Sequence, residues 1–122
     1  MERLEFSQNW NNKLLCFNFT TIRPVSKKYE TGLVLDIRIK DAHLCYAKVV
    51  DVKTFTLQQI SDLNFNLIDS GLKQKDFFEF MHRLYSKKSW WKEKDTNMNV
   101  VFFEKISQLD MFDDNNEKFN KQ

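Results

Sequence analysis

The fold of this chain is decided by residues 6–32, which read FSQNWNNKLLCFNFTTIRPVSKKYETG. The first part of this stretch predicts a short amphipathic helix over residues 8–15, with Lys13 on its solvent side and three apolar residues facing inward: Trp10, Leu14 and Leu15. The β-branched and apolar residues that follow predict a strand or extended loop over residues 17–23. Pro24 ends it, because proline has no backbone donor.

Gly32 opens the clearest strand pattern in the sequence. Apolar residues alternate along one face, which predicts a half-buried strand: Leu33, Leu35, Ile37 and Ile39. A short reversal at residues 41–43 leads into a second predicted strand over residues 44–55. The doubled Val49-Val50 in this strand indicates a bulge or a change of face. The residues expected to face inward are Cys45, Ala47 and Val49.

The middle of the chain changes to helical spacing. Thr56 and Gln59 fit a capping box, which predicts the start of a short helix over residues 57–63. A further helical turn over residues 65–69 is expected to close at Gly71 in a left-handed conformation. The strongest helix is predicted over residues 73–86, where apolar side chains recur at spacings of three and four: Phe77, Phe80, Met81, Leu84 and Tyr85.

The last predicted element is a strand over residues 97–106, centred on four apolar residues that indicate an interior position. The order of helix, strands, helices and strand predicts an α+β fold with a mostly antiparallel sheet and helices packed on one side. The length of 122 residues suits one domain, which we assign to residues 1–107. Residues 108–122 read as a polar C-terminal tail that we expect to be frayed.

Composition limits the classes of function. The formal net charge is only +2, which permits nucleic-acid binding without indicating it. Cys16 and Cys45 are too few for a disulfide framework or a zinc site, so we expect them to be reduced, at least partly buried and cytosolic. No apolar run is long enough for a membrane span, so we expect a soluble, cytoplasmic protein with no metal or cofactor.

Several features, taken in order, make the chain resemble the ASCH family, a branch of the PUA-like β-barrels. They are an aromatic-rich opening, the triplet Thr21-Ile22-Arg23, Gly32, and Asp69 placed two residues before Gly71. The resemblance covers residues 6–103 and implies a small curled PUA-like barrel with helices on one side. It also implies a ligand cleft between barrel and helices, lined by the threonine and arginine segment.

Thr20, Thr21 and Arg23 are the first candidate site residues. A guanidinium offers forked donors to a phosphate or a base edge, and neighbouring hydroxyls can donate to an anion. Spacing alone favours two ordinary strand threonines and an arginine in an internal ion pair. The resemblance favours the ligand-binding interpretation.

The resemblance also suggests a catalytic alternative. Family members that hydrolyse N4-acetylcytidine use a lysine, a threonine and a glutamate, and the matching residues here are Thr21 and Asp69. The lysine position is occupied by Asn18, and an amide cannot act as a base or nucleophile near neutral pH. This departure counts against catalysis, and Asp69 alone also fits a helix-end residue bonded to nearby amides.

A second candidate surface interleaves Trp90 and Trp91 with lysines, as in proteins on which nucleic-acid bases stack. The alternative is that one or both indoles cover the end of the barrel. Lys27 and Lys28 are candidates for extending this positive surface. The isolated His43 and His82 give no strong metal signal.

We therefore predict a small intracellular domain that binds RNA, single-stranded nucleic acid or a nucleotide-like ligand. The predicted nucleic-acid-binding residues are Thr20, Thr21, Arg23, Lys27, Lys28, Trp90 and Trp91. The alternatives are an amidohydrolase of the N4-acetylcytidine type, with Thr21 and Asp69 as catalytic residues, and a protein-interaction module. The sequence favours a binding protein over an enzyme and leaves the oligomeric state open.

Overall fold

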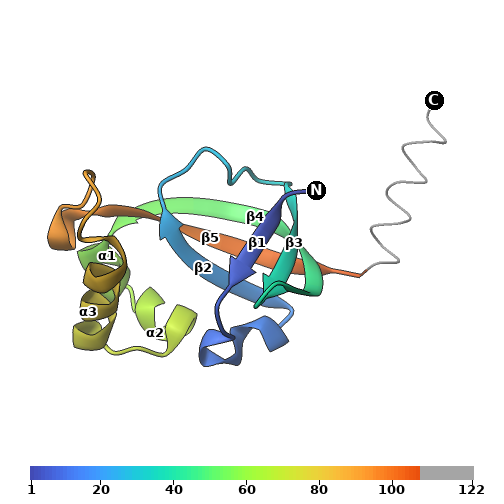
Figure 1. Ribbon diagram of the computed structural model, residues 1–122, viewed down its shortest axis with the longest axis horizontal. Coiled ribbons are helices and arrows are strands. Elements are labelled where there is room, and N and C mark those ends of the chain that lie inside the picture. The colour runs from blue at the N-terminus through green and yellow to red at the C-terminus, as the bar shows by residue number, and fades with distance from the viewer. Residues whose placement is uncertain (108–122) are drawn as a thin grey trace.

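The computed structural model describes residues 1–107, and the predictions made for residues 108–122 lie outside this range. The described chain forms one curled sheet with helices gathered along one side and at one end of it (Figure 1). The elements in chain order are β1 (Arg3–Phe6), η1 (Trp10–Leu15), β2 (Asn18–Pro24), β3 (Val34–Ile39), β4 (Ala42–Thr56), α1 (Leu57–Asp62), α2 (Phe65–Ser70), α3 (Gln74–Tyr85), η2 (Glu93–Asp95) and β5 (Asn97–Ile106).

The sheet has the strand order β1-β3-β4-β5-β2 and forms a half-barrel. β1 runs parallel to β3, and the other three pairings are antiparallel, so the sheet is mixed. The α+β class is confirmed, but β1 was not predicted from the sequence. A strand of four residues is too short to show a clear alternation of apolar and polar side chains. β1 forms because its backbone pairs with the edge of β3.

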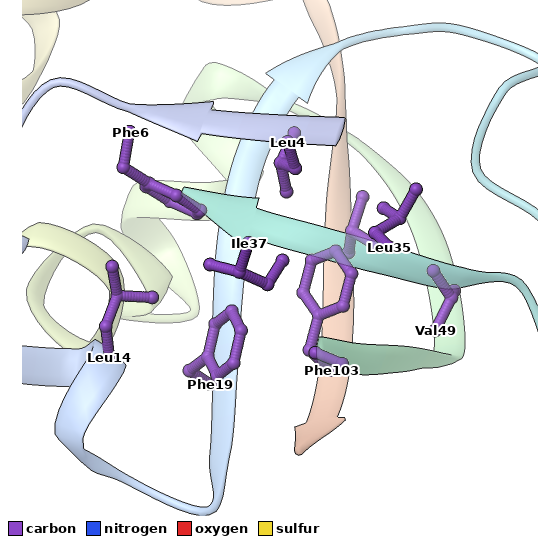
Figure 2. Packing of buried hydrophobic residues seen from close by; sticks show 10 residues of the cluster. Leu4, Phe6, Leu14, Phe19, Leu35, Ile37, Val49 and Phe103 are labelled. Carbon is purple, nitrogen blue, oxygen red and sulfur yellow. The ribbon is translucent and has the colours of Figure 1, made fainter. Parts of the chain in front are cut away.

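Side chains bridge the open seam between the two edge strands, β1 and β2. The rings of Phe6 and Phe19 meet edge to face at 6.5 Å, and Nη2 of Arg23 donates to the carbonyl oxygen of Glu5 at 2.9 Å. The main core lies behind these contacts, where residues from all five strands and from η1 converge (Figure 2). The labelled members of this core are Leu4, Phe6, Leu14, Phe19, Leu35, Ile37, Val49 and Phe103.

A second core lies between α3, α1 and the other end of the sheet. Phe77 and Met81 of α3 are buried against Ile22 of β2 and Val100 of β5. The predicted helical stripe is therefore confirmed at its centre, but Leu84 is exposed. β5 is the interior strand that its apolar run predicted, since it lies between β4 and β2.

Several features predicted from local sequence patterns are confirmed in β3, β4, α1 and α2. Leu35 and Ile37 are fully buried, and the register of β4 against β5 shifts between Val49 and Asp51, which confirms the predicted bulge. The capping box is present: the amide of Gln59 donates to Oγ1 of Thr56 at 3.1 Å, and the Thr56 amide donates to Oε1 of Gln59 at 2.9 Å. Gly71 ends α2 with φ of 75°.

The first helical segment differs most from its prediction. Asn11 and Asn12 adopt left-handed conformations, with φ of 54° and 53°, so the segment is a broken 3-10 helix rather than a continuous amphipathic helix. The break changes which side chains face inward. Lys13 is only 7% exposed, whereas Leu15 is 74% exposed, the reverse of the prediction.

Two other expectations concern cysteines and membranes. Cys16 is exposed, contrary to the expected burial, because it follows η1 as the chain turns toward β2; Cys45 is half-buried, and both are free thiols. Within residues 1–107, none of the helices has the length and apolar character needed to cross a bilayer.

We expect Phe77→Ala to lower the free energy of unfolding by about 3–5 kcal/mol, because it empties a fully enclosed site between α3 and the sheet. Urea unfolding at neutral pH measures the effect. Phe80→Ala is the matched comparison, since Phe80 is half-buried and packs edge to face on Trp10 at 5.1 Å. An equal or larger loss for Phe80→Ala would contradict the packing of α3 described above.

Candidate functional site: a cavity at the open seam

A buried ion pair joins η1 to α2. Nζ of Lys13 lies 2.7 Å from Oδ1 of Asp69, and both residues are less than a tenth exposed. The same carboxylate oxygen accepts a 2.8 Å hydrogen bond from Oγ1 of Thr20 on β2. Two neighbouring segments, η1 and β2, therefore meet the distant α2 at one carboxylate.

The asparagines of η1 set the position of Lys13. Nδ2 of Asn11 donates to the carbonyl oxygens of Leu67 and Ile68, both at 3.2 Å, and so ties η1 to the end of α2. Oδ1 of Asn9 accepts from the amide of Leu14 at 2.9 Å, which holds the segment around the left-handed break. These bonds bring Lys13 and Asp69 together.

Gly71 contributes to the same contact. A Cβ atom at this position would lie 3.3 Å from Oδ1 of Asn11, in a backbone conformation that side chains rarely adopt. Glycine therefore allows the end of α2 to approach η1 closely.

The ionisation of Lys13 reflects competing effects. Burial lowers the pKa of the Lys13 ammonium below its ordinary value, and the positive charge of Arg23 acts in the same direction. The carboxylate of Asp69 opposes this effect by attracting and hydrogen-bonding the ammonium. Lys13 is therefore easier to deprotonate than a surface lysine.

Arg23 lies beside this ion pair and bridges the seam. Its Nε donates to Oγ1 of Thr21 at 2.9 Å, and its guanidinium stacks 4.9 Å from the centre of the Phe6 ring. Nζ of Lys13 lies 5.1 Å from the same ring, so Phe6 contacts two cations. Among residues 1–107, no carboxylate forms an ion pair with Arg23. Within this range, the sequence-based alternative of an internal ion pair for Arg23 is therefore wrong.

A cavity of about 430 Å³ opens at this seam between β1, η1, β2 and α3. One part of its wall is polar and carries the side chains of Lys13, Asp69, Thr21 and Arg23. The other part is aromatic and carries Phe6, Trp10, Phe77, Phe80 and Tyr85. Burial raises the pKa of the Tyr85 phenol, so that group stays protonated across the neutral range.

The predicted site residues separate into two groups. Thr21, Arg23 and Asp69 line this cavity together. Thr20 does not line it, but its hydroxyl donates to Asp69, which does. Lys27, Lys28, Trp90 and Trp91 do not line it. Lys28 instead lies at the surface, where Nζ donates to the carbonyl oxygen of Arg3 at 3.2 Å.

The two indoles also differ from each other. Trp90 is 39% exposed and lines a separate cavity of about 540 Å³ with Pro24 and Val25. Trp91 is half-buried and packs against the second core, where its Nε1 has no hydrogen-bond partner among residues 1–107. Trp91 therefore supports the second core, as the alternative from the sequence allowed for one of the two indoles, and its role in binding nucleic acid stays a prediction.

The inward position of Lys13 was not predicted from the sequence. A regular helix of period 3.6 would point this residue to solvent, and only the left-handed turns at Asn11 and Asn12 bring it inward. Asparagine is enriched in left-handed conformations, so the Asn11-Asn12 pair was the signal that could have indicated a break.

A second cavity of about 410 Å³ lies on the other side of the ion pair. Lys13 lines both cavities, whereas Thr20 and Asn18 line only the second. Consecutive strand residues point to opposite faces, which explains why Thr20 and Thr21 face different cavities. Asn18 is exposed at the start of β2.

A polar cluster on β3 and β4 lies outside these cavities. Asp36 accepts from Nε of Arg38 at 2.9 Å and lies 2.6 Å from Nδ1 of His43. These contacts, that of His43 first, lower the pKa of the Asp36 carboxyl. No group of three or more metal-ligating side chains comes together in the described range.

Comparisons with protein-family models, with curated proteins and with solved structures found no match to this chain.

We expect the variants Lys13→Met and Asp69→Leu to be destabilised by about 3–5 kcal/mol each, because each leaves a buried charge without its partner. The double variant should be much less destabilised than the sum of the two. Urea unfolding of all four proteins gives the coupling free energy. The exposed pair Lys53 and Asp51, 3.5 Å apart, is the matched control and should show coupling below about 1 kcal/mol.

The lowered pKa of Lys13 predicts how stability depends on pH. Between the folded-state pKa and the ordinary value of 10.5, the unfolded chain binds more protons at this residue than the folded chain does. The free energy of unfolding of the wild type, relative to Lys13→Met, should therefore rise as the pH increases from neutral toward 10. A constant or falling difference in urea unfolding experiments would contradict the assigned direction.

Proposed function

We propose that this protein is a small intracellular ASCH-like domain that binds a nucleoside or nucleotide in the cavity at the seam. The half-barrel is loosely compatible with the PUA-like barrel type that the sequence resembles. The observation that carries the proposal is the pairing, in one cavity, of an aromatic wall with a compact set of polar groups.

The aromatic wall suits a planar ligand. Trp10 and Phe80 meet edge to face at 5.1 Å, and Phe6 and Tyr85 line the same space. Aromatic rings stack on the π-face of any nucleobase, and this interaction contributes about 1–3 kcal/mol per base. The volume of about 430 Å³ lies in the usual range for small-molecule sites.

The polar wall suits the edge of a base or the sugar. Arg23 uses Nε and Nη2 within the protein, which leaves Nη1 for a ligand carbonyl or phosphate oxygen. Asp69 accepts from Lys13 and Thr20 through Oδ1, which leaves Oδ2 to accept from an amino or hydroxyl group. The proposed site therefore offers both a donor and an acceptor beside the rings.

Isothermal titration calorimetry with cytidine, uridine, adenosine and guanosine tests this function. We expect at least one nucleoside to bind, and Arg23→Ala to weaken its binding about 10-fold or more, since hydrogen bonds to charged groups contribute about 1.5–3 kcal/mol. Arg83→Ala is the control, because Arg83 is exposed on α3 and lies outside the cavity. The proposal fails if no nucleoside binds at millimolar concentration, or if Arg23→Ala unfolds the domain.

A second candidate function is hydrolysis of a modified nucleoside such as N4-acetylcytidine. The observation that favours it is the contact of Lys13, Asp69 and Thr20, which supplies from η1 an amine that the motif lacks at Asn18. In this candidate, uncharged Lys13 accepts a proton from the attacking group, and Asp69 orients Lys13 and Thr20. Water is consumed, and cytidine and acetate are released.

Chromatography of N4-acetylcytidine incubated with the pure protein tests the second candidate. Cytidine release should fall at least about 100-fold in Lys13→Arg, because arginine keeps the charge but cannot act as a base. The control is Lys27→Arg, at an exposed position outside the cavity. Binding of nucleosides without any release of cytidine would leave the protein as a binding module.

A further inference from the structure

The cavity lined by Trp90 lies close to the seam cavity. Arg23 lines the seam cavity and the next residue, Pro24, lines the Trp90 cavity. The ring of Tyr85, in the wall of the seam cavity, lies 5.5 Å from the ring of Trp90. Consecutive strand residues face opposite sides, so the two spaces are neighbours where the rings of Tyr85 and Trp90 meet.

The backbone holds Trp90 in this position. The amide of Lys88 donates to the carbonyl oxygen of Tyr85 at 2.9 Å, and the amide of Trp91 donates to the carbonyl oxygen of Lys88 at 3.1 Å. Trp91 then anchors the turn by packing against the second core. Trp90 is thus a partly exposed ring on a supported turn, and a ligand would not have to order it.

The surroundings of Trp90 favour an anionic, ring-bearing ligand. Pro24 and Val25 add apolar side chains to the wall of the cavity, and Lys92 lines it too. Lys87 and Lys88 are exposed on the turn between Tyr85 and Trp90. Asp95 and Asn97 add acceptor groups at the rim that could meet the amino groups of a base.

We propose that the Trp90 cavity is a second nucleotide subsite, so that the ligand of this protein is a single-stranded oligonucleotide rather than a free nucleoside. This inference rests on the proposed function of the seam cavity. One base lies in the seam cavity, the neighbouring base stacks on Trp90, and the lysines of the turn contact the phosphates. The combination of a stacking ring with adjacent lysines is the general mode of single-strand recognition.

The subsite predicts that affinity depends on ligand length. The 5′-monophosphate of the nucleoside that binds most tightly in calorimetry, or of cytidine if none binds, occupies only one subsite, whereas a fluorescein-labelled tetranucleotide of the same base can occupy both. We expect the tetranucleotide to bind at least about 10-fold more tightly than the monophosphate, from stacking and from additional phosphate contacts. The RNA and DNA forms of the tetranucleotide show whether the ribose hydroxyl contributes, and tighter binding by either form supports the subsite.

Variants at Trp90 separate this inference from the proposed function. Trp90→Leu should weaken tetranucleotide binding about 5- to 100-fold, the equivalent of one lost stacking contact, and should leave monophosphate binding unchanged within about twofold. Trp90→Phe keeps a ring and should retain most of the affinity. Urea unfolding of both variants checks that the turn is intact.

The inference is overturned if the tetranucleotide binds no more tightly than the monophosphate while the monophosphate still binds, in which case the nucleoside site stands alone. It is also overturned if Trp90→Leu weakens both ligands equally, because Trp90 would then act only by supporting Tyr85. If the tetranucleotide binds through Trp90 but the monophosphate does not bind, the subsite stands and the proposed nucleoside site fails. Absence of binding by either ligand overturns both proposals.

Discussion

The contact between the Lys13 ammonium and the Asp69 carboxylate is the interaction on which the rest of the site depends. It joins η1 to α2 across 2.7 Å in a place where each residue is less than a tenth exposed. Removing either partner would leave a buried charge without its counter-ion, which is energetically costly. The ion pair therefore fixes η1 and α2 relative to each other. Thr20 bonds to the same carboxylate and thereby attaches β2 to them. The walls of both adjoining cavities are built around this group of three residues.

The half-barrel explains why a site forms at this place. A closed barrel would pair all its strands, but here β1 and β2 remain as edges that do not pair with each other. Their seam is bridged by Arg23, which donates to the carbonyl oxygen of Glu5 and stacks on Phe6. The helical segments cover the remaining gap incompletely, and the uncovered space is the cavity. An unclosed edge is a common place for function, because polar groups there remain close to water.

Sequence patterns predicted the elements in which a regular spacing of apolar residues or a local capping motif matches the final structure. The alternation around Leu35 and Ile37 gave the buried face of β3, and Thr56 with Gln59 gave the start of α1, since both signals depend only on near neighbours. The same reasoning failed for Lys13, because two residues in a left-handed conformation shift the phase of the helix. Sequence also could not tell the two adjacent indoles apart, since Trp90 is exposed whereas Trp91 is half-buried against the second core. Of the candidate site, Thr21, Arg23 and Asp69 were identified in advance, and the buried amine was not.

The sequence by itself determined the α+β class, the bulge in β4 and the glycine that ends α2, because local backbone preferences and short-range periodicity decide these features. The tertiary structure alone decided that an asparagine-broken turn brings Lys13 to Asp69 over a separation of 56 residues. It also decided that Tyr85 and Trp90 bring two cavities together. Such contacts depend on how the elements pack. The free energy that selects one packing over another comes from contacts throughout the core, so no single segment of sequence predicts it.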